Sequence, residues 1–168
     1  IRGGKRLRGG TYEIGPDRIE AGTFALIAAA TRSTITLRHV RYEHLLALLD
    51  KLNEAGIPHR RDRNALTVCG RRSLRPVSIT THPYPGFPTD LQAQFTALMA
   101  VTPGVSLVTD KVFPDRFMHI AELNRMGANI RREGNAAIIE GVSELYGAPV
   151  MASDLRASAA LVIAALAA

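Results

Sequence analysis

Apolar residues recur along the chain in two alternating patterns, one with the period of a helix and one with the period of a strand. Alanine and leucine at helical spacing predict a helix after Asp17 and a similar one after Asp90. The β-branched stretches 33–37 and 105–109 predict strands. An amphipathic helix is expected after each strand, and in the first copy its apolar stripe consists of Leu45, Leu46, Leu48, Leu49 and Leu52.

These patterns belong to an internal repeat. The spacing from Gly56 to Gly127, each a suitable helix end, equals the spacing from Asn64 to Asn135, each followed by a strand-like stretch. We call this common spacing the repeat interval. The closing strands are expected at 65–69 and 76–80 in the first copy and at 136–140 in the second. The start of a third copy is the run Asp154-Leu155-Arg156-Ala157-Ser158.

The repeat predicts an α/β (α+β) fold made of helix–strand–helix–strand–strand units. Within residues 1–168 we expect repeat one at about 11–80, repeat two at about 81–150 and a truncated repeat three at 151–168. A pseudo-threefold arrangement would bury the alanine-rich helices at a common centre, since small side chains permit close approach.

Composition narrows the class of protein. Hydrophobic residues make up 46% and charged residues 21%, which is typical of a globular domain. The single cysteine excludes an internal disulfide and favours a reducing compartment. The chain opens without Met or an apolar leader, so we expect a fragment, and no apolar run reaches the roughly 20 residues of a membrane span.

The net charge of +6 leaves nucleic-acid binding open. However, the basic residues are scattered and are not interleaved with aromatic side chains that could stack on bases. A basic repeat module that binds nucleic acid is therefore kept as an alternative to an enzyme with anionic substrates, for which no nucleic-acid or membrane partner is expected.

The three repeats are expected to place an acid at the same point, the start of the alanine-rich helix: Asp17, Asp90 and Asp154. Each is a suitable N-cap, and helix N-termini also bind anions. Asp90 differs because three prolines precede it in the run 82–90, which restricts the backbone of the loop. That loop is either a stiff crossover or a support that positions a general base.

The run 111–119 holds a second group of candidates. Arg116 could bind a phosphate or carboxylate, or it could pair with Asp115 or a helix end. Phe113 is either a wall of the site or core, and His119 is interpreted as structural. The histidines lack metal-ligand spacing, and no phosphate-binding glycine motif occurs, so no metal and no cofactor are expected.

Several runs resemble the UDP-N-acetylglucosamine 1-carboxyvinyltransferase family, a sibling of 5-enolpyruvylshikimate-3-phosphate (EPSP) synthase. They are spread over about residues 10–168. The runs are Pro16-Asp17-Arg18-Ile19-Glu20-Ala21-Gly22-Thr23, Pro83-Tyr84-Pro85-Gly86-Phe87-Pro88-Thr89-Asp90-Leu91-Gln92-Ala93-Gln94, Val112-Phe113-Pro114-Asp115-Arg116-Phe117-Met118-His119, Glu122-Leu123-Asn124-Arg125-Met126-Gly127-Ala128 and Ala152-Ser153-Asp154-Leu155-Arg156-Ala157-Ser158.

The resemblance implies two similar lobes, each an inside-out α/β barrel of three βαβαββ units, with substrates bound between the lobes. It implies that residues 1–168 form part of one lobe. It also implies a cytoplasmic transferase of peptidoglycan synthesis. That enzyme moves the enolpyruvyl group of phosphoenolpyruvate to the 3′-hydroxyl of UDP-N-acetylglucosamine and releases phosphate through a tetrahedral intermediate. The partners implied are these two substrates and the second lobe of the same polypeptide.

The resemblance also assigns roles to individual residues. Asp90 corresponds to the carboxylate that takes the hydroxyl proton, and Asp154 is the second catalytic candidate, near the phosphoenolpyruvate-derived centre and supported by Arg156. The residues implied in substrate binding are Thr89, Asp90, Val112, Phe113, Arg116, Arg156 and Arg18.

Some of the family's functional residues lie outside this sequence. They include a mobile-loop cysteine, which does not correspond to the strand-like Cys69, and several phosphate-binding arginines. We therefore expect these 168 residues alone to be inactive. The sibling EPSP synthase, with a different acceptor, remains the nearest alternative, although the run 87–94 argues against it.

Overall fold

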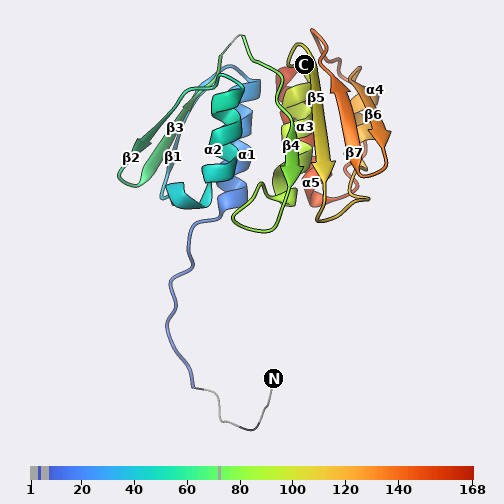
Figure 1. The fold of residues 1–168 in the computed structure, drawn as a ribbon. Helices are drawn as coiled ribbons and strands as arrows, with labels where there is room; N and C mark the ends of the chain where they lie inside the picture. Colours follow the sequence, from blue (N-terminus) through green and yellow to red (C-terminus); the bar gives the residue numbers. More distant parts are fainter. Residues whose placement is uncertain (1–3, 5–7, 72) are drawn as a thin grey trace.

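The structure is a computed structural model that describes residue 4 and residues 8–71 and 73–168. Residues 8–16 contain no helix or strand and lead into the first helix (Figure 1). The helices are α1 (Arg18–Ala30), α2 (Leu46–Glu54), α3 (Gln92–Ala100), α4 (His119–Arg125) and α5 (Leu155–Ala167), with 3₁₀ turns η1 (Tyr42–His44) and η2 (Thr89–Leu91). The strands are β1 (Thr34–Arg38), β2 (His59–Asp62), β3 (Ala65–Cys69), β4 (Ile79–Thr81), β5 (Val105–Asp110), β6 (Asn129–Glu133) and β7 (Ala136–Glu140).

The strands form two sheets whose pairing repeats along the chain. The first sheet has the order β1-β3-β2 and the second the order β4-β5-β7-β6. Ile35 pairs with Val68 in the first sheet, and Ser106 pairs with Ile139 in the second. Ser106 lies one repeat interval after Ile35, and Ile139 lies one repeat interval after Val68. The predicted repeat is therefore present in the register of the sheets as well as in the sequence.

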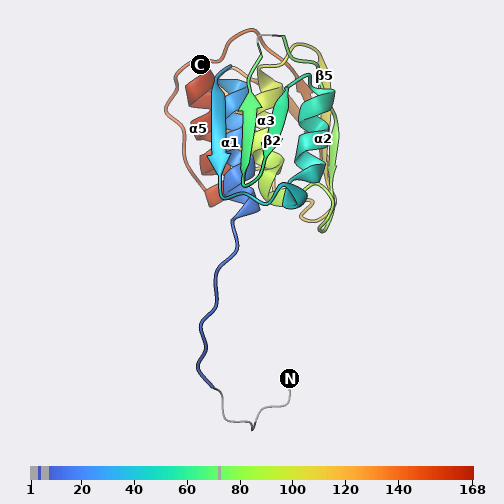
Figure 2. The ribbon, with the colours of Figure 1, turned by 90° about the vertical axis from the view of Figure 1, so that its left-hand side faces the viewer.

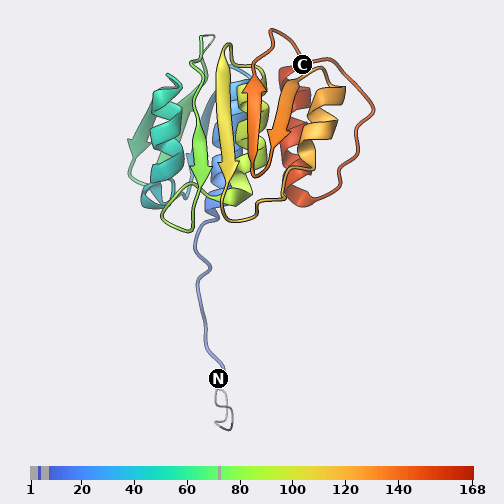
Figure 3. The same ribbon diagram turned by 45° about the vertical axis from the view of Figure 1, so that its right-hand side comes forward.

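Three alanine-rich helices pack together between the sheets. α3 lies beside α5, and α1 contacts both. The sheet of β1, β2 and β3 covers α1, and the second sheet covers α3 (Figures 2 and 3). This arrangement confirms the expected common centre of helices, inside two outer sheets. The alanines buried there include Ala25, Ala28, Ala29, Ala97, Ala100, Ala160 and Ala164.

Two details of the expected repeat are wrong. Strands β2 and β6 were not predicted, because their charged and exposed residues hide the strand periodicity. The strand expected at 76–80 does not close the first unit, since Ile79–Thr81 pairs in parallel with β5 in the second sheet. Repeat two is thus β4-α3-β5-α4-β6-β7, the βαβαββ order, whereas no described strand takes the place of β4 beside β1.

Gly70 and Gly141 hold equivalent positions directly after β3 and β7. A Cβ atom on Gly70 would overlap the carbonyl oxygen of Ala28 in α1, and one on Gly141 would overlap the carbonyl oxygen of Thr102 just after α3. Backbone atoms cannot rotate aside as a flexible side chain can. The absent side chain therefore lets the last strand of each repeat turn closely against the end of its first helix.

We expect Gly70→Ala and Gly141→Ala each to lower the free energy of unfolding of the full-length protein by about 1–3 kcal/mol, because the new methyl group displaces backbone. Gly147 is exposed with no heavy atom near its Cβ position, so Gly147→Ala should change stability by less than about 0.5 kcal/mol. Chemical denaturation compares the three variants. A Gly141→Ala protein as stable as the wild type would contradict the close contact.

Candidate functional site

The three central helices start at the same end of the molecule (Figure 1). Two of the three acids near these starts are N-caps. Asp17 Oδ1 accepts a hydrogen bond from the N–H of Ile19 at 2.7 Å, and Asp154 Oδ1 accepts one from the N–H of Arg156 at 2.7 Å. Asp154 also accepts from Ala157 at 3.0 Å. These carboxylates satisfy the first N–H groups of α1 and α5, as expected of capping residues.

Asp90 differs because Pro88 takes the position before its helical turn. η2 begins at Thr89, so Asp90 lies inside the turn and caps neither η2 nor α3. The repeat interval pairs Asp17 with Pro88 and Asp90 with Ile19. The expectation that all three acids occupy the same point of the repeat is therefore wrong for Asp90, whose carboxylate remains available for other contacts.

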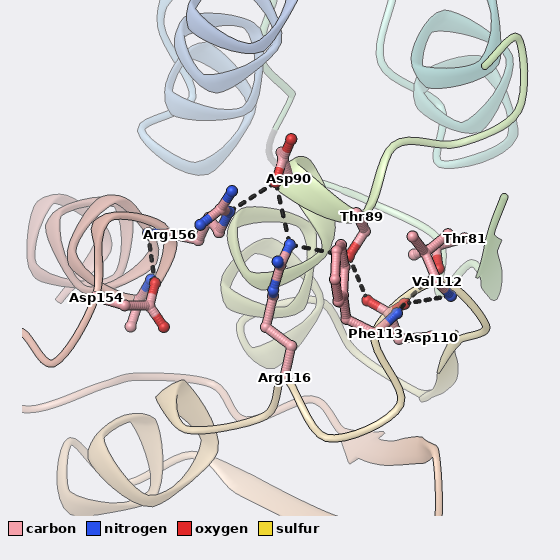
Figure 4. Close-up of polar contacts among 10 residues, drawn as sticks. Thr81, Thr89, Asp90, Asp110, Val112, Phe113, Arg116, Asp154 and Arg156 are labelled. Carbon is pink, nitrogen blue, oxygen red and sulfur yellow. Dashed lines mark hydrogen bonds and ion pairs between the residues drawn. The ribbon is translucent and has the colours of Figure 1, made fainter. Parts of the chain in front are cut away.

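The Asp90 carboxylate binds two arginines through one oxygen. Arg156 Nε donates to Oδ1 at 2.6 Å, and Arg116 Nη1 donates to the same atom at 3.1 Å. The described residues provide no hydrogen-bond partner for Oδ2, which points away from both guanidinium groups in Figure 4. The side chain is 37% exposed. One oxygen is thus held in place while the other can receive a proton from a bound hydroxyl.

A hollow of about 250 Å³ lies beside this carboxylate. Its walls come from all three central helices, with Thr23 on α1, Gln94 on α3 and Arg156 on α5. A larger hollow of about 650 Å³ lies between α1 and β1 and includes Asp17. We place the candidate site at the smaller hollow, because it holds the carboxylate that two arginines bind, whereas Asp17 in the larger one is already used in capping.

Arg116 reaches Asp90 from the loop between β5 and α4. Its guanidinium carbon lies 3.7 Å from the centre of the Phe113 ring, and Nη1 lies 3.4 Å from Thr89 Oγ1. The neighbouring Asp115 pairs with Arg132 at 2.7 Å. Of the partners that the sequence left open for Arg116, Asp115 is therefore excluded.

Asp110 connects these segments, although it was not singled out in the sequence. The residue is fully buried at the end of β5. Its Oδ1 accepts from the Thr81 hydroxyl at 2.7 Å and from the N–H groups of Val112 and Phe113 at 2.9 and 2.8 Å. Its Oδ2 accepts from the Thr89 hydroxyl at 2.7 Å.

The environment of Asp110 favours the ionised form. Burial alone would raise the pKa of this carboxyl, but hydrogen bonds from Phe113, Thr89, Thr81 and Val112 outweigh burial and lower the pKa. The sequence signal that could have identified Asp110 is its position directly after the predicted strand 105–109. A carboxylate at a buried strand end needs hydrogen-bond donors, so this position indicates polar neighbours.

Arg18 and Arg156 differ in their contacts with Asp90. The Arg18 guanidinium lies 4.8 Å from the centre of the Tyr84 ring, in the proline-rich loop 82–90, and no hydrogen bond or ion pair of the described residues joins Arg18 to Asp90. Arg156 supports Asp154 through its backbone N–H, while its guanidinium turns to Asp90. Hydrogen bonds and stacking thus join the side chains of Thr89, Asp90, Phe113, Arg116 and Arg156, whereas the contact given for Arg18 is with Tyr84.

The pKa of Asp154 is also lowered. The hydrogen bond from the N–H of Ala157 is the largest cause; burial opposes it, and the N–H and positive charge of Arg156 add to it. His119, at the start of α4, is only 2% exposed, and its Nε2 has no hydrogen-bond partner among the described residues. Burial lowers the pKa of His119 to about 4, although the charges of Asp154 and Asp110 oppose this.

Comparison with known proteins identifies the family. Residues 1–168 match the family model of EPSP synthase (3-phosphoshikimate 1-carboxyvinyltransferase). The chain belongs to the EPSP synthase family. Its curated relatives include UDP-N-acetylglucosamine 1-carboxyvinyltransferases from Deinococcus deserti, 57% identical over 99% of the chain, and from Granulibacter bethesdensis, 51% identical over 100% of the chain. These matches confirm the resemblance drawn from the sequence motifs.

Solved structures of enolpyruvyl transferases share the fold. NikO from Streptomyces tendae matches 92% of the chain with a TM-score of 0.82 at 24% identity. EPSP synthase from Acinetobacter baumannii matches 92% of the chain with a TM-score of 0.68 at 15% identity. The chain covers 37% and 38% of those two proteins and spans 39–40% of the length of the two curated relatives named above.

None of the helices in the described part of this EPSP synthase family chain combines the length and apolar character that crossing a bilayer requires.

We expect the buried His119 to make this family member less stable as the pH falls from 6.5 to about 4. Within this window the unfolded chain binds a proton that the folded chain does not, so stability present above pH 6.5 is lost. The difference in pKa corresponds to a loss of about 3 kcal/mol once the window is crossed. Urea unfolding of the full-length protein at about pH 7 and about pH 5 measures the slope.

His119→Gln removes the titrating group and should flatten this slope. His82→Gln, at an exposed position of the proline-rich loop, is the matched control and should retain it. Identical slopes for the wild type and His119→Gln would show that the buried imidazole does not govern this pH dependence.

Proposed function

We propose that the full-length protein transfers the enolpyruvyl group of phosphoenolpyruvate to the 3′-hydroxyl of UDP-N-acetylglucosamine and releases phosphate. Relatives that are 51–57% identical over almost the whole chain bear the name of this activity. The observation that carries the proposal is the Asp90 carboxylate, with Oδ1 held by two guanidinium groups and Oδ2 open beside a hollow.

Asp90 acts as the general base. Its Oδ2 accepts the proton of the sugar hydroxyl while the hydroxyl oxygen bonds to C2 of phosphoenolpyruvate and the methylene carbon C3 gains a proton that comes from solvent through an acid of the full-length protein. The tetrahedral adduct then loses phosphate and one proton of the new methyl group. These two losses restore the double bond in the enolpyruvyl ether. The methyl proton returns to solvent and the proton held by Asp90 passes to the departing phosphate, which balances the reaction.

Arg116 and Arg156 supply positive charge where the substrates are negative. Guanidinium groups bind carboxylate and phosphate through charge-assisted hydrogen bonds, and they stabilise charge that develops as phosphate leaves. Asp154 is the second catalytic candidate. Its lowered pKa keeps it anionic near neutral pH, which suits removal of the methyl proton better than donation of a proton.

Thr89, Val112, Phe113 and Arg18 are assigned to substrate binding. Phe113 is 48% exposed and stacks on Arg116, so its free face can contact the nucleotide sugar. We place the reaction in the cytoplasm, at the first committed step of peptidoglycan synthesis, and we assign the remaining substrate contacts to the second lobe of the polypeptide. The 168 residues alone should therefore be inactive.

We expect the full-length protein to release phosphate from phosphoenolpyruvate when UDP-N-acetylglucosamine is the acceptor. Asp90→Asn should lower kcat by about 10²–10⁴, because the amide still accepts from both arginines at Oδ1 but cannot take a proton. A coupled phosphate-release assay measures both proteins. Asp115→Asn is the control, since the exposed Asp115 carboxylate pairs with Arg132 away from Asp90.

The choice of acceptor separates the competing functions. Phosphate release with shikimate 3-phosphate in place of UDP-N-acetylglucosamine would assign the EPSP synthase reaction instead. Salt-sensitive binding of DNA or RNA without any phosphate release would favour the basic nucleic-acid module. Full activity of Asp90→Asn with UDP-N-acetylglucosamine would exclude Asp90 as the base and leave the overall reaction standing.

A further inference from the structure

We propose that Asp110 is a positioning residue for the Asp90 site. It fixes the direction of the Thr89 hydroxyl, so that the Thr89 oxygen accepts a hydrogen bond from Arg116 and holds that guanidinium against Asp90. Asp110 itself is fully buried and lies on the side of the Phe113 ring away from Arg116 (Figure 4). The kinetic part of this inference rests on the proposed function, whereas the geometric part does not.

The direction of each hydrogen bond follows from what Asp110 can do. An ionised carboxylate only accepts, so the single hydroxyl hydrogen of Thr89 must point to Asp110 Oδ2, at 2.7 Å. The lone pairs of Thr89 Oγ1 then face outward and receive Arg116 Nη1 at 3.4 Å. A neutral side chain at position 110 would not impose this orientation.

The other carboxylate oxygen of Asp110 fixes the turn that carries Phe113, the residue on which Arg116 stacks. Oδ1 accepts from the N–H groups of Val112 and Phe113 and so fixes the turn that follows β5. Phe113 presents its ring to the Arg116 guanidinium at 3.7 Å. The buried Asp110 carboxylate thus positions both Thr89 Oγ1 and the Phe113 ring, and the Arg116 guanidinium lies between them.

Repeat one shows that the scaffold does not need this acid. The counterpart of Asp110 is His39, one repeat interval earlier in the chain. The N–H of His39 donates to the carbonyl of Asn64 at 2.7 Å, just as the N–H of Asp110 donates to the carbonyl of Asn135 at 2.9 Å. The backbone hydrogen bond at this strand end therefore forms with an exposed histidine at this position, although His39 takes a positive φ of 57° and the segment after it follows a different course.

Repeat one also lacks the residues that Asp110 would position. Arg18 corresponds to Thr89, and Ile19 corresponds to Asp90. Asp110, the Thr89 hydroxyl and the Asp90 carboxylate occur together in repeat two, and their counterparts are absent together from the described repeat one. This joint occurrence is expected of parts that act on one another and is not required by the fold of the repeat.

Asp110→Asn tests the proposal in the full-length protein. The amide oxygen can keep the N–H groups of Val112 and Phe113, while the NH₂ group faces Thr89 and donates to the oxygen that Arg116 uses. We expect kcat to fall by about 10–100-fold, because a displacement of about 1 Å in a positioned group has this effect. KM for the acceptor should change by less than about threefold, since only the placement of reacting groups is altered.

A double-mutant cycle distinguishes positioning through Thr89 from a general structural role. Thr89→Val should lower kcat by a similar factor, and the Asp110→Asn/Thr89→Val double variant should be no more than about threefold slower than either single variant. Thr89→Ser, which keeps the hydroxyl, should restore kcat. Losses that multiply in the double variant would show that Asp110 does not act through Thr89 and would overturn the proposal.

A matched control covers the loss of a buried hydroxyl. Ser106 in β5 is buried and accepts from the N–H of Val77 at 3.2 Å, away from Arg116. Ser106→Ala should lower the melting temperature much as Thr89→Val does, but it should retain the kcat of the wild type. A kcat loss in Ser106→Ala equal to that in Thr89→Val would contradict the specific role of the Thr89 hydroxyl.

Crystal structures provide a readout that does not depend on the reaction. In full-length Asp110→Asn and Thr89→Val, the distance between Arg116 Nη1 and Asp90 Oδ1 should exceed the 3.1 Å seen here, while Ser106→Ala should keep it. An unchanged distance in both variants overturns the proposal even if the wild type catalyses another reaction. Absence of enolpyruvyl transfer by a wild type with this geometry would instead refute the proposed function alone. If Asp110→Asn does not fold, the distance in the crystal structure of Thr89→Val alone tests the proposal.

Discussion

The close packing of α1, α3 and α5 is the constraint on which the rest of the structure depends. Many of the residues buried on these helices are alanine, and small side chains let the helices approach one another closely. Helix starts from separate repeats consequently meet at one end. The ion pair between Asp90 and Arg156 joins residues 66 positions apart, and it exists only because the start of α5 lies beside η2.

Within this common end, local backbone geometry gives chemically identical side chains different tasks. Asp17 and Asp154 precede their helices, so their carboxylates bind backbone N–H groups. Pro88 takes that place ahead of η2, and Asp90 enters the turn itself. A shift of two residues thus separates a capping acid from one whose carboxylate meets two arginines and still has an open oxygen.

Much of the fold could be predicted from the sequence, because apolar periodicity and the return of similar runs at the repeat interval are visible in the sequence itself. The central helices, β1, β3, β5 and β7 follow from them. β2 and β6 could not be found in this way, since their arginine-rich strands owe their pairing to neighbouring strands and not to their own apolar residues.

The candidate site was predictable only in part. Asp90, Arg116 and Arg156 were identified through their motifs, but the sequence did not indicate that both guanidinium groups meet on one carboxylate oxygen. Asp110 was missed because its role depends on hydroxyl groups from Thr81 and Thr89, about 20–30 positions away, which only the folded chain brings together.

The central claim is that Asp90 receives the proton of the acceptor hydroxyl. A crystal structure of the full-length protein with UDP-N-acetylglucosamine bound tests it most directly. The sugar 3′-hydroxyl should lie about 3 Å from Asp90 Oδ2, the distance that proton transfer requires, while Oδ1 keeps both arginines. A hydroxyl beyond hydrogen-bond reach of Asp90, or an acceptor seated in the hollow between α1 and β1, would contradict the claim.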